Sequence, residues 1–113
     1  MRYMLLVYGD ETLELSPEQT AAMDASTQSW VEEMTARGVR LHGDRLRPTL
    51  DATTVRVRDG EVLVSDGPFA ETAEQVGGYD LIECRDLDEA TEVATRHPVA
   101  ELGTIEIRPL WYQ

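Results

Sequence analysis

A carboxylate held beside a tight turn is the feature of this sequence with the clearest chemical use. Asp66 precedes Gly67 and Pro68, and glycine and proline fix the backbone of such turns. A carboxylate positioned in this way at the end of a strand can act as a general base or bind a polar ligand. Alternatively, Asp66 caps its own turn by accepting backbone hydrogen bonds. Glu71 follows Phe69 closely and either binds a ligand or caps a short turn.

Two histidines supply groups that titrate near neutral pH. His97 lies at the expected end of a helix, where it is either an acid or base of the site or a cation stabilised by the helix C-terminus. His42 lies on an expected strand, alongside Arg40 and opposite Leu41. It becomes a pocket group if that face of the sheet lines a cavity, and it is inert if that face is solvated.

Strand tyrosines can also line a pocket and present a hydroxyl group, with core packing as the alternative for each. Tyr8 and Tyr79 are the two that we include in the expected site. The candidate catalytic residues are therefore Asp66 and His97, and the candidate ligand-binding residues are His42, Glu71, Tyr79 and Tyr8.

The composition excludes several kinds of chemistry. All 10 basic residues are arginines, so Schiff-base chemistry and a P-loop, which need lysine, are excluded. Cys84 is the one cysteine, which excludes an internal disulfide and a cysteine metal cluster. The two histidines show no diagnostic spacing with Asp44 or Asp66, so we expect neither a metal nor a cofactor.

Length and charge narrow the possible partners. The 113 residues predict one domain over residues 1–113. The net charge of −12, from 22 acidic and 10 basic residues, repels phosphate backbones and anionic membranes. Because of this charge, we expect the protein to bind neither nucleic acid nor membrane. Because there is no leader and no long apolar run, we expect it to be cytoplasmic.

The first two elements are expected to be a strand and a helix. Arg2–Tyr8 alternates in a way that makes both faces of the strand apolar. A helix begins after Ser16, where Pro17 suits the first helical position and Gln19 completes a capping box. Gly38 ends this helix.

A β-hairpin is expected in the middle of the chain. After a second strand over residues 39–43, Asp59-Gly60 marks a two-residue turn between strands 54–58 and 61–65. The pairs on one face are Val57 with Val62 and Val55 with Val64, and Arg58 pairs with Glu61 on the other.

The last part of the chain repeats the strand–helix–strand order. A strand over residues 78–84 precedes a helix that begins at Asp86, with Glu89 as its capping-box partner, and Pro98 stops it. The last strand spans residues 104–108. The expected buried side of the helix is Leu87, Ala90, Val93 and Ala94.

With the hairpin set aside, strand–helix–strand occurs twice. This order predicts an α+β protein with the ferredoxin-like, split βαβ arrangement, in which one antiparallel sheet carries both helices on one face. The helices leave the other face open. Because the first strand is apolar on that face too, we expect a second copy of the chain to cover it and form a homodimer.

The segment 65–72 (SDGPFAET) resembles the DGPF family of YCII-related proteins. The similarity extends over nearly the whole chain and includes Arg2–Tyr8, Glu74-Gln75, Gly77–Tyr79, His97-Pro98 and Ile105–Pro109. The resemblance implies a ferredoxin-like domain that forms a dimeric α/β barrel. Most members have no assigned reaction, and some resemble proteins encoded beside sigma factors.

Two departures limit what the resemblance implies. Many members carry lysine where Ala73 stands, so any role of that lysine is absent here. Smaller YCII proteins look as if they have a His–Asp pair, with His on the first helix and Asp before a proline. The first helix here has no His, and the residue before Pro98 is His97, so that pair is not transferred.

From these features we expect a small dimeric α/β-barrel protein. It would bind a small polar molecule in a cavity between the sheet and its partner, where the candidate residues converge, and any catalysis would be cofactor-free acid/base chemistry. The alternative is a non-catalytic regulatory or protein-interaction module associated with transcription. The sequence leaves open whether the protein is an enzyme.

Overall fold

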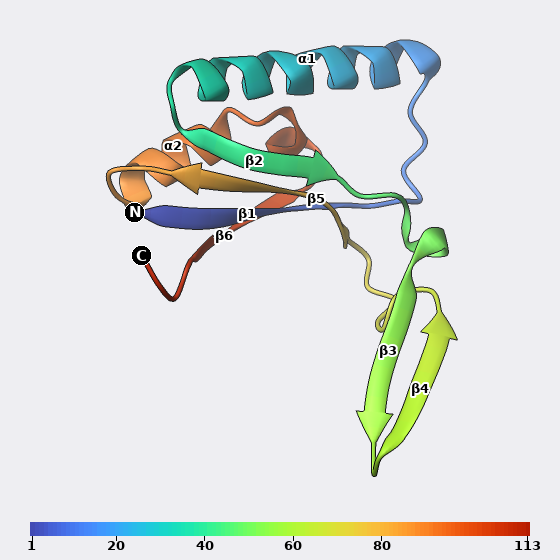
Figure 1. The fold of residues 1–113 in the computed structure, drawn as a ribbon. Helices are drawn as coiled ribbons and strands as arrows, with labels where there is room; N and C mark the ends of the chain where they lie inside the picture. The colour runs from blue at the N-terminus through green and yellow to red at the C-terminus, as the bar shows by residue number, and fades with distance from the viewer.

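A computed structural model describes residues 1–113 and has two helices layered on one face of a four-stranded sheet (Figure 1). The sheet order is β2-β5-β1-β6, and all neighbouring strands are antiparallel. This order confirms the ferredoxin-like prediction. The sheet is open at both edges and forms no closed barrel within the chain. The elements are β1 (Arg2–Gly9), α1 (Pro17–Ala36), β2 (Arg40–Arg45), η1 (Thr49–Asp51), β3 (Thr53–Arg58), β4 (Glu61–Asp66), β5 (Gln75–Glu83), α2 (Leu87–Thr95), η2 (Pro98–Glu101) and β6 (Thr104–Pro109).

The helix boundaries follow from capping residues. The Ser16 hydroxyl accepts from the Gln19 N–H, and the Gln19 side chain accepts from the Ser16 N–H, so the capping box of α1 is confirmed. Gly38 adopts a φ of +73° directly after the helix, a conformation that glycine tolerates well. At α2, Asp86 caps the Glu89 N–H. The Glu89 carboxylate binds the Arg85 N–H instead of completing the box.

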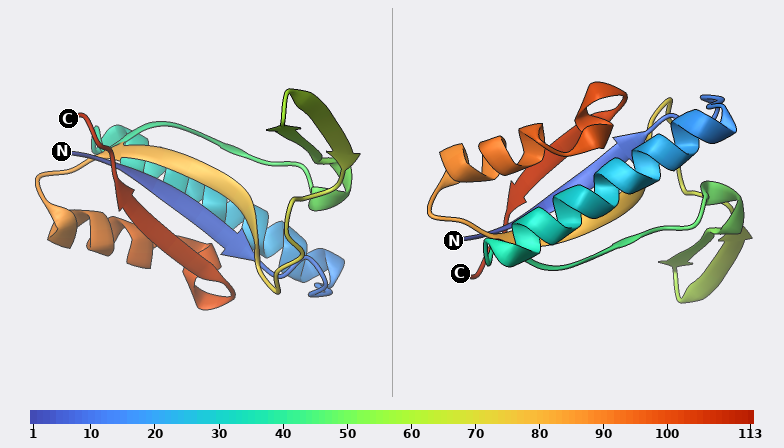
Figure 2. Two further views of the ribbon diagram at one scale, coloured as in Figure 1. Left: turned by 90° about the horizontal axis from the view of Figure 1, so that it is seen from below. Right: turned by 90° about the horizontal axis from the view of Figure 1, so that it is seen from above.

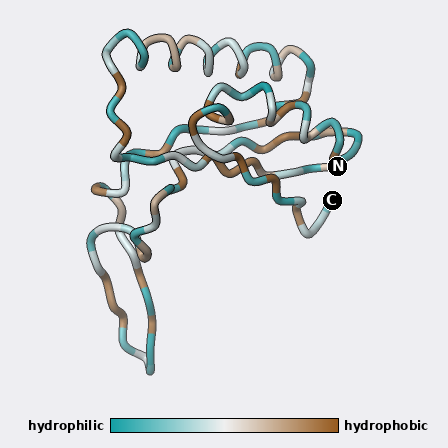
Figure 3. The backbone as a smooth tube through the Cα atoms, turned by 180° about the vertical axis from the view of Figure 1, so that it is seen from behind, coloured by the Kyte–Doolittle hydropathy of each residue, from teal (hydrophilic) through white to brown (hydrophobic).

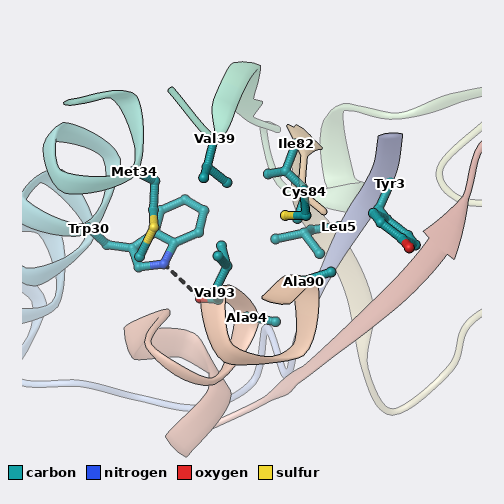
Figure 4. Packing of buried hydrophobic residues seen from close by; sticks show 10 residues of the cluster. All are labelled: Tyr3, Leu5, Trp30, Met34, Val39, Ile82, Cys84, Ala90, Val93 and Ala94. Carbon is teal, nitrogen blue, oxygen red and sulfur yellow. Dashed lines mark hydrogen bonds between the residues drawn. The ribbon is translucent and has the colours of Figure 1, made fainter. Parts of the chain in front are cut away.

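The hydrophobic core lies between the sheet and the helices, beneath α2 and the C-terminal half of α1 (Figure 4). Trp30 anchors α1 to α2 because its indole Nε1 donates to the Val93 carbonyl at 3.0 Å. Leu87 is half exposed, so its predicted burial is wrong. It occupies the first position of α2, at the solvated end of that helix. The core cluster is Tyr3, Leu5, Trp30, Met34, Val39, Ile82, Cys84, Ala90, Val93 and Ala94.

The two faces of the sheet differ in what covers them. Along β1, Tyr3, Leu5 and Val7 point toward the helices and are buried, whereas Met4 and Leu6 lie on the other face and are half-buried. No helix covers that second face (Figure 1), which we call the open face. None of the helices is long and apolar enough to cross a membrane.

The hairpin β3–β4 forms a separate two-stranded sheet with the predicted register. Asp59 and Gly60 have φ values of +52° and +77°, as a type I′ turn requires. The hairpin projects away from the body on the side opposite the helices (Figure 1). All of its residues are exposed except Thr54, which is half-buried.

Candidate functional site

A pocket of about 430 Å³ lies between the middle of α1, where residues 23–31 line it, and the sheet. It exists because α1 runs along the sheet while the shorter α2 lies beside only the C-terminal half of α1 (Figure 2). Val7, Val31 and Val99 contribute apolar walls. Its volume falls in the range of small-molecule sites, about 300–1,000 Å³. We call this cavity the α1 pocket.

A buried ion pair lines the α1 pocket. Arg40 Nε donates to Asp80 Oδ1 at 2.7 Å, and the two side chains are 17% and 8% exposed. Burial raises the pKa of Asp80, and the hydrogen bond and charge of Arg40 oppose that shift without cancelling it. The terminal Nη atoms of Arg40 make no hydrogen bond within the chain, and no buried side-chain nitrogen or oxygen lacks a partner. The Nη atoms therefore reach the space of the pocket.

His97 contributes a neutral imidazole to the same pocket. It is buried, packs edge-on against Trp30 and accepts the Val99 N–H through Nδ1 at 3.1 Å. Burial, and secondarily the charge of Arg40, lowers the pKa of His97 to about 4. Because Nδ1 is an acceptor, the proton of the neutral ring lies on Nε2. Nε2 has no hydrogen-bond partner within the chain. Because no buried side-chain nitrogen or oxygen lacks a partner, this donor must reach the space of the pocket.

The interpretation of His97 as a helix C-terminal cation is wrong. α2 ends at Thr95, and His97 is instead the N-cap of η2. Burial, and secondarily the charge of Arg40, lowers the pKa of the ring and holds it neutral there, and its unprotonated Nδ1 caps the turn.

Gly43 keeps the pocket and the ion pair in place. A Cβ atom at this position would collide with Asp80 Oδ1 and would lie 2.5 Å from the Tyr79 carbonyl oxygen and 2.7 Å from Arg40 Nη2. Real Cβ atoms do not approach other atoms so closely. The absence of a side chain therefore allows Arg40 to turn across β2 and meet Asp80.

The structure brings two of the candidate ligand-binding residues together on the open face. Tyr79 Oη and His42 Nε2 share a hydrogen bond of 2.8 Å, with their rings edge-to-face. His42 does not lie alongside Arg40 as expected, because a bulge between the two residues places them on opposite faces of β2. Tyr8 and Tyr79 border the α1 pocket, but strand alternation directs their side chains to the open face.

Asp66 and Glu71 lie together elsewhere, in a hollow of about 440 Å³ at the base of the hairpin. Asp10 and Glu11 line it too, and hydrogen bonds from Thr12 and Thr49 lower their respective pKa values. We call this region the acidic hollow. The carboxylates of Asp66 and Glu71 accept no hydrogen bond within the chain, so the interpretation of either as a turn cap is wrong.

The six candidate residues are thus divided among three places, with Asp66 and His97 in different cavities. Sequence reasoning missed Arg40 and Asp80. The available signal was alternation along β5, where Asp80 occupies the same face as the buried Ile82. An acidic residue at an inward position needs a cation beside it, and Arg40 is that cation.

The side chains of the types that bind metal ions are scattered over the structure. No three His, Cys, Asp or Glu side chains lie close enough together to hold a metal ion. Cys84 is a free, buried thiol whose pKa is raised mainly by burial, and it packs as a small residue of the hydrophobic core.

The fold and the α1 pocket define a small α+β protein whose first helix covers a half-enclosed cavity with apolar walls and a few polar groups. The family model of the YCII-related domain matches residues 1–112, so the chain belongs to the YCII-related family. It is also similar to an uncharacterized protein of Rhizobium meliloti (strain 1021), with 39% identity over 114 residues, which cover 97% of this chain and 92% of that protein.

Proposed function

We propose that this protein binds a small polar molecule in the α1 pocket. The observation that carries the proposal is the presence, in one cavity, of the Arg40–Asp80 ion pair and the unpartnered Nε2–H of His97. Apolar walls with a few convergent polar groups are typical of ligand sites. The ligand would place an oxygen acceptor against Arg40 and His97 and its apolar part against Val7 and Val31.

Cofactor-free acid/base catalysis is a second function that these groups support. In this proposal Asp80 removes a proton from a carbon beside a carbonyl group, and the oxyanion that forms accepts hydrogen bonds from His97 and Arg40. The burial that raises the pKa of Asp80 favours this function, since a more basic carboxylate is a better proton acceptor. The low pKa of His97 suits a neutral hydrogen-bond donor.

We also propose that the protein is a homodimer in which the open faces of two sheets meet. The half-buried apolar side chains of Met4, Leu6 and Leu81 on that face support this arrangement, because an apolar sheet face is normally covered.

A cytoplasmic location is part of the proposal, and the unpaired thiol of Cys84 is compatible with a reducing compartment.

The exposed hairpin favours a different candidate function, a non-catalytic interaction module associated with transcription. Its valines form an apolar surface of the kind that protein partners cover. In that case the hairpin would contact the partner protein, and compounds that occupy the α1 pocket would leave the contact unchanged.

Ligand binding is tested first with small aryl carboxylates and ketones, such as benzoate and acetophenone, screened by ligand-detected NMR. We expect His97→Asn to weaken binding of a hit about 10–100-fold, because the loss of a hydrogen bond to a buried group costs roughly 1–3 kcal/mol. Asparagine can still cap the Val99 N–H but is too short to replace Nε2–H.

Asp66→Asn is the matched control, since Asp66 lines the acidic hollow rather than the α1 pocket. We expect its affinity to equal that of the unmodified protein. The proposal is wrong if Asp66→Asn loses binding while His97→Asn retains it, because the ligand would then occupy the acidic hollow.

A further inference from the structure

The hairpin Thr53–Asp66, which we call the arm, has almost nothing of its own chain to pack on. Its valine face consists of Val55, Val57, Val62 and Val64, which pair across the two strands and are each 57–63% exposed. Hydrophobic residues occur along both strands of the arm (Figure 3). An isolated two-stranded hairpin is marginally stable in water and needs a third strand or another packing surface. The arm therefore lacks a surface that its fold requires.

We propose that the arm is an intermolecular clasp, whose valine face docks on a second copy of this chain. The arm projects toward the side of the sheet that carries the open face (Figure 1). A second protomer seated on the open face would lie beside it. This inference rests on the proposed homodimer and adds that the arm, as well as the sheet, contacts the partner. In a two-fold dimer the contact occurs twice.

The dimensions of the arm fit this role. Each of its strands has six residues, which corresponds to a length of about 20 Å. A four-stranded sheet with strands about 4.8 Å apart has a similar width, so one arm reaches across a protomer. At its base, Leu50 and Phe69 are also highly exposed, which extends the apolar surface toward the body. Two such arms add a large apolar area to a sheet-to-sheet contact, and stable interfaces bury about 800 Å² on each partner.

The distribution of charge also favours the arm as a surface of contact between two copies of the chain. Arg56 and Arg58 nearly balance the three acidic residues of the arm, so residues 53–66 carry only −1 of the net charge of −12. Two strongly acidic bodies repel each other, and the nearly neutral arm is the segment that meets the least repulsion. Association through it should also strengthen with added salt, because salt screens the remaining repulsion.

The experiment is sedimentation velocity of the whole chain across a concentration series, comparing two double variants. Val55→Thr/Val64→Thr keeps the β-branched shape but makes the valine face polar. Leu63→Thr/Ser65→Thr changes the opposite face of the arm without altering its charge and is the control. We expect the dimer dissociation constant to rise at least 100-fold in the first variant and to change less than fivefold in the second.

Amide hydrogen exchange of the unmodified protein locates the contact independently of any variant. We expect the amides of the arm to be protected at concentrations where the dimer is populated and to exchange rapidly in the monomer. A dimer whose arm amides exchange rapidly, and which both variants leave intact, would overturn the clasp while the sheet-to-sheet homodimer stands. A monomer at every concentration would overturn both.

Discussion

Replacing Arg40 by methionine is expected to lower the free energy of unfolding by about 3–5 kcal/mol, the usual cost of leaving one member of a buried ion pair alone. The Asp80 side chain is 8% exposed and its hydrogen bond comes from Arg40 Nε. Methionine keeps the apolar stem of the arginine side chain, so the loss reports mainly the unpaired carboxylate. Urea denaturation at pH 7 measures it, with an unchanged m-value showing that the unfolding transition is the same.

The double variant Arg40→Met/Asp80→Leu is the control for this prediction. It removes both charges, and we expect it to recover stability to within about 1 kcal/mol of the unmodified protein, because apolar replacements of buried pairs are often neutral or stabilising. The deficit of Arg40→Met should also shrink at acid pH, where Asp80 becomes protonated and no longer needs a cation. A loss below about 1 kcal/mol at pH 7 would show that water already solvates Asp80.

Acidification is expected to destabilise the protein through His97 by about 3 kcal/mol. The ring has a pKa of about 4 in the folded protein, against the ordinary histidine value of 6.5, so the unfolded chain binds the proton more tightly. The neutral ring therefore makes its full contribution to the free energy of unfolding above pH 6.5, and this contribution is lost as the pH falls toward 4. Each unit of pKa difference between the folded and unfolded protein corresponds to about 1.4 kcal/mol, which gives the expected loss of about 3 kcal/mol. Urea denaturation at a series of pH values measures the slope.

His97→Asn isolates this effect from the other titrating groups. Asparagine does not titrate, and its side-chain oxygen can accept the Val99 N–H in place of Nδ1. The variant loses packing against Trp30, so its stability is lower at all pH values. We expect the difference between the two proteins to be largest at pH 7 and to diminish toward pH 4. Parallel stability curves over this range would show that His97 is solvated and able to titrate normally.

Much of the fold was predictable because local signals agreed with one another. The Asp59-Gly60 turn fixed the register of the arm, since the type I′ turn leaves the valines paired on one face. The Ser16 capping box began α1, and Gly38 ended it. These are short-range interactions, which a single sequence displays directly.

The site was harder to predict because it depends on contacts between distant residues. Arg40 and Asp80 are forty positions apart and meet only when β2 pairs with β5. The bulge after Arg40 left no mark in the residue pattern, yet it moves His42 to the open face. Pro98 was expected only to stop a helix, but it also begins η2 and buries His97 as the cap. The role of Asp66 stays a prediction, now with the acidic hollow as its setting.

The most direct measurement of the central proposal is amide chemical-shift mapping of an aryl carboxylate or ketone hit, compared between Thr27→Phe and Thr20→Phe. Thr27 lines the α1 pocket, so phenylalanine there should fill the pocket and abolish binding. Thr20 lies exposed on the same helix, outside the pocket, and its replacement should leave binding unchanged. We predict shifts around Gly43, Asp80 and His97 that vanish only in Thr27→Phe. Undiminished binding to Thr27→Phe, or shifts confined to the acidic hollow, would contradict a small-molecule site beneath α1.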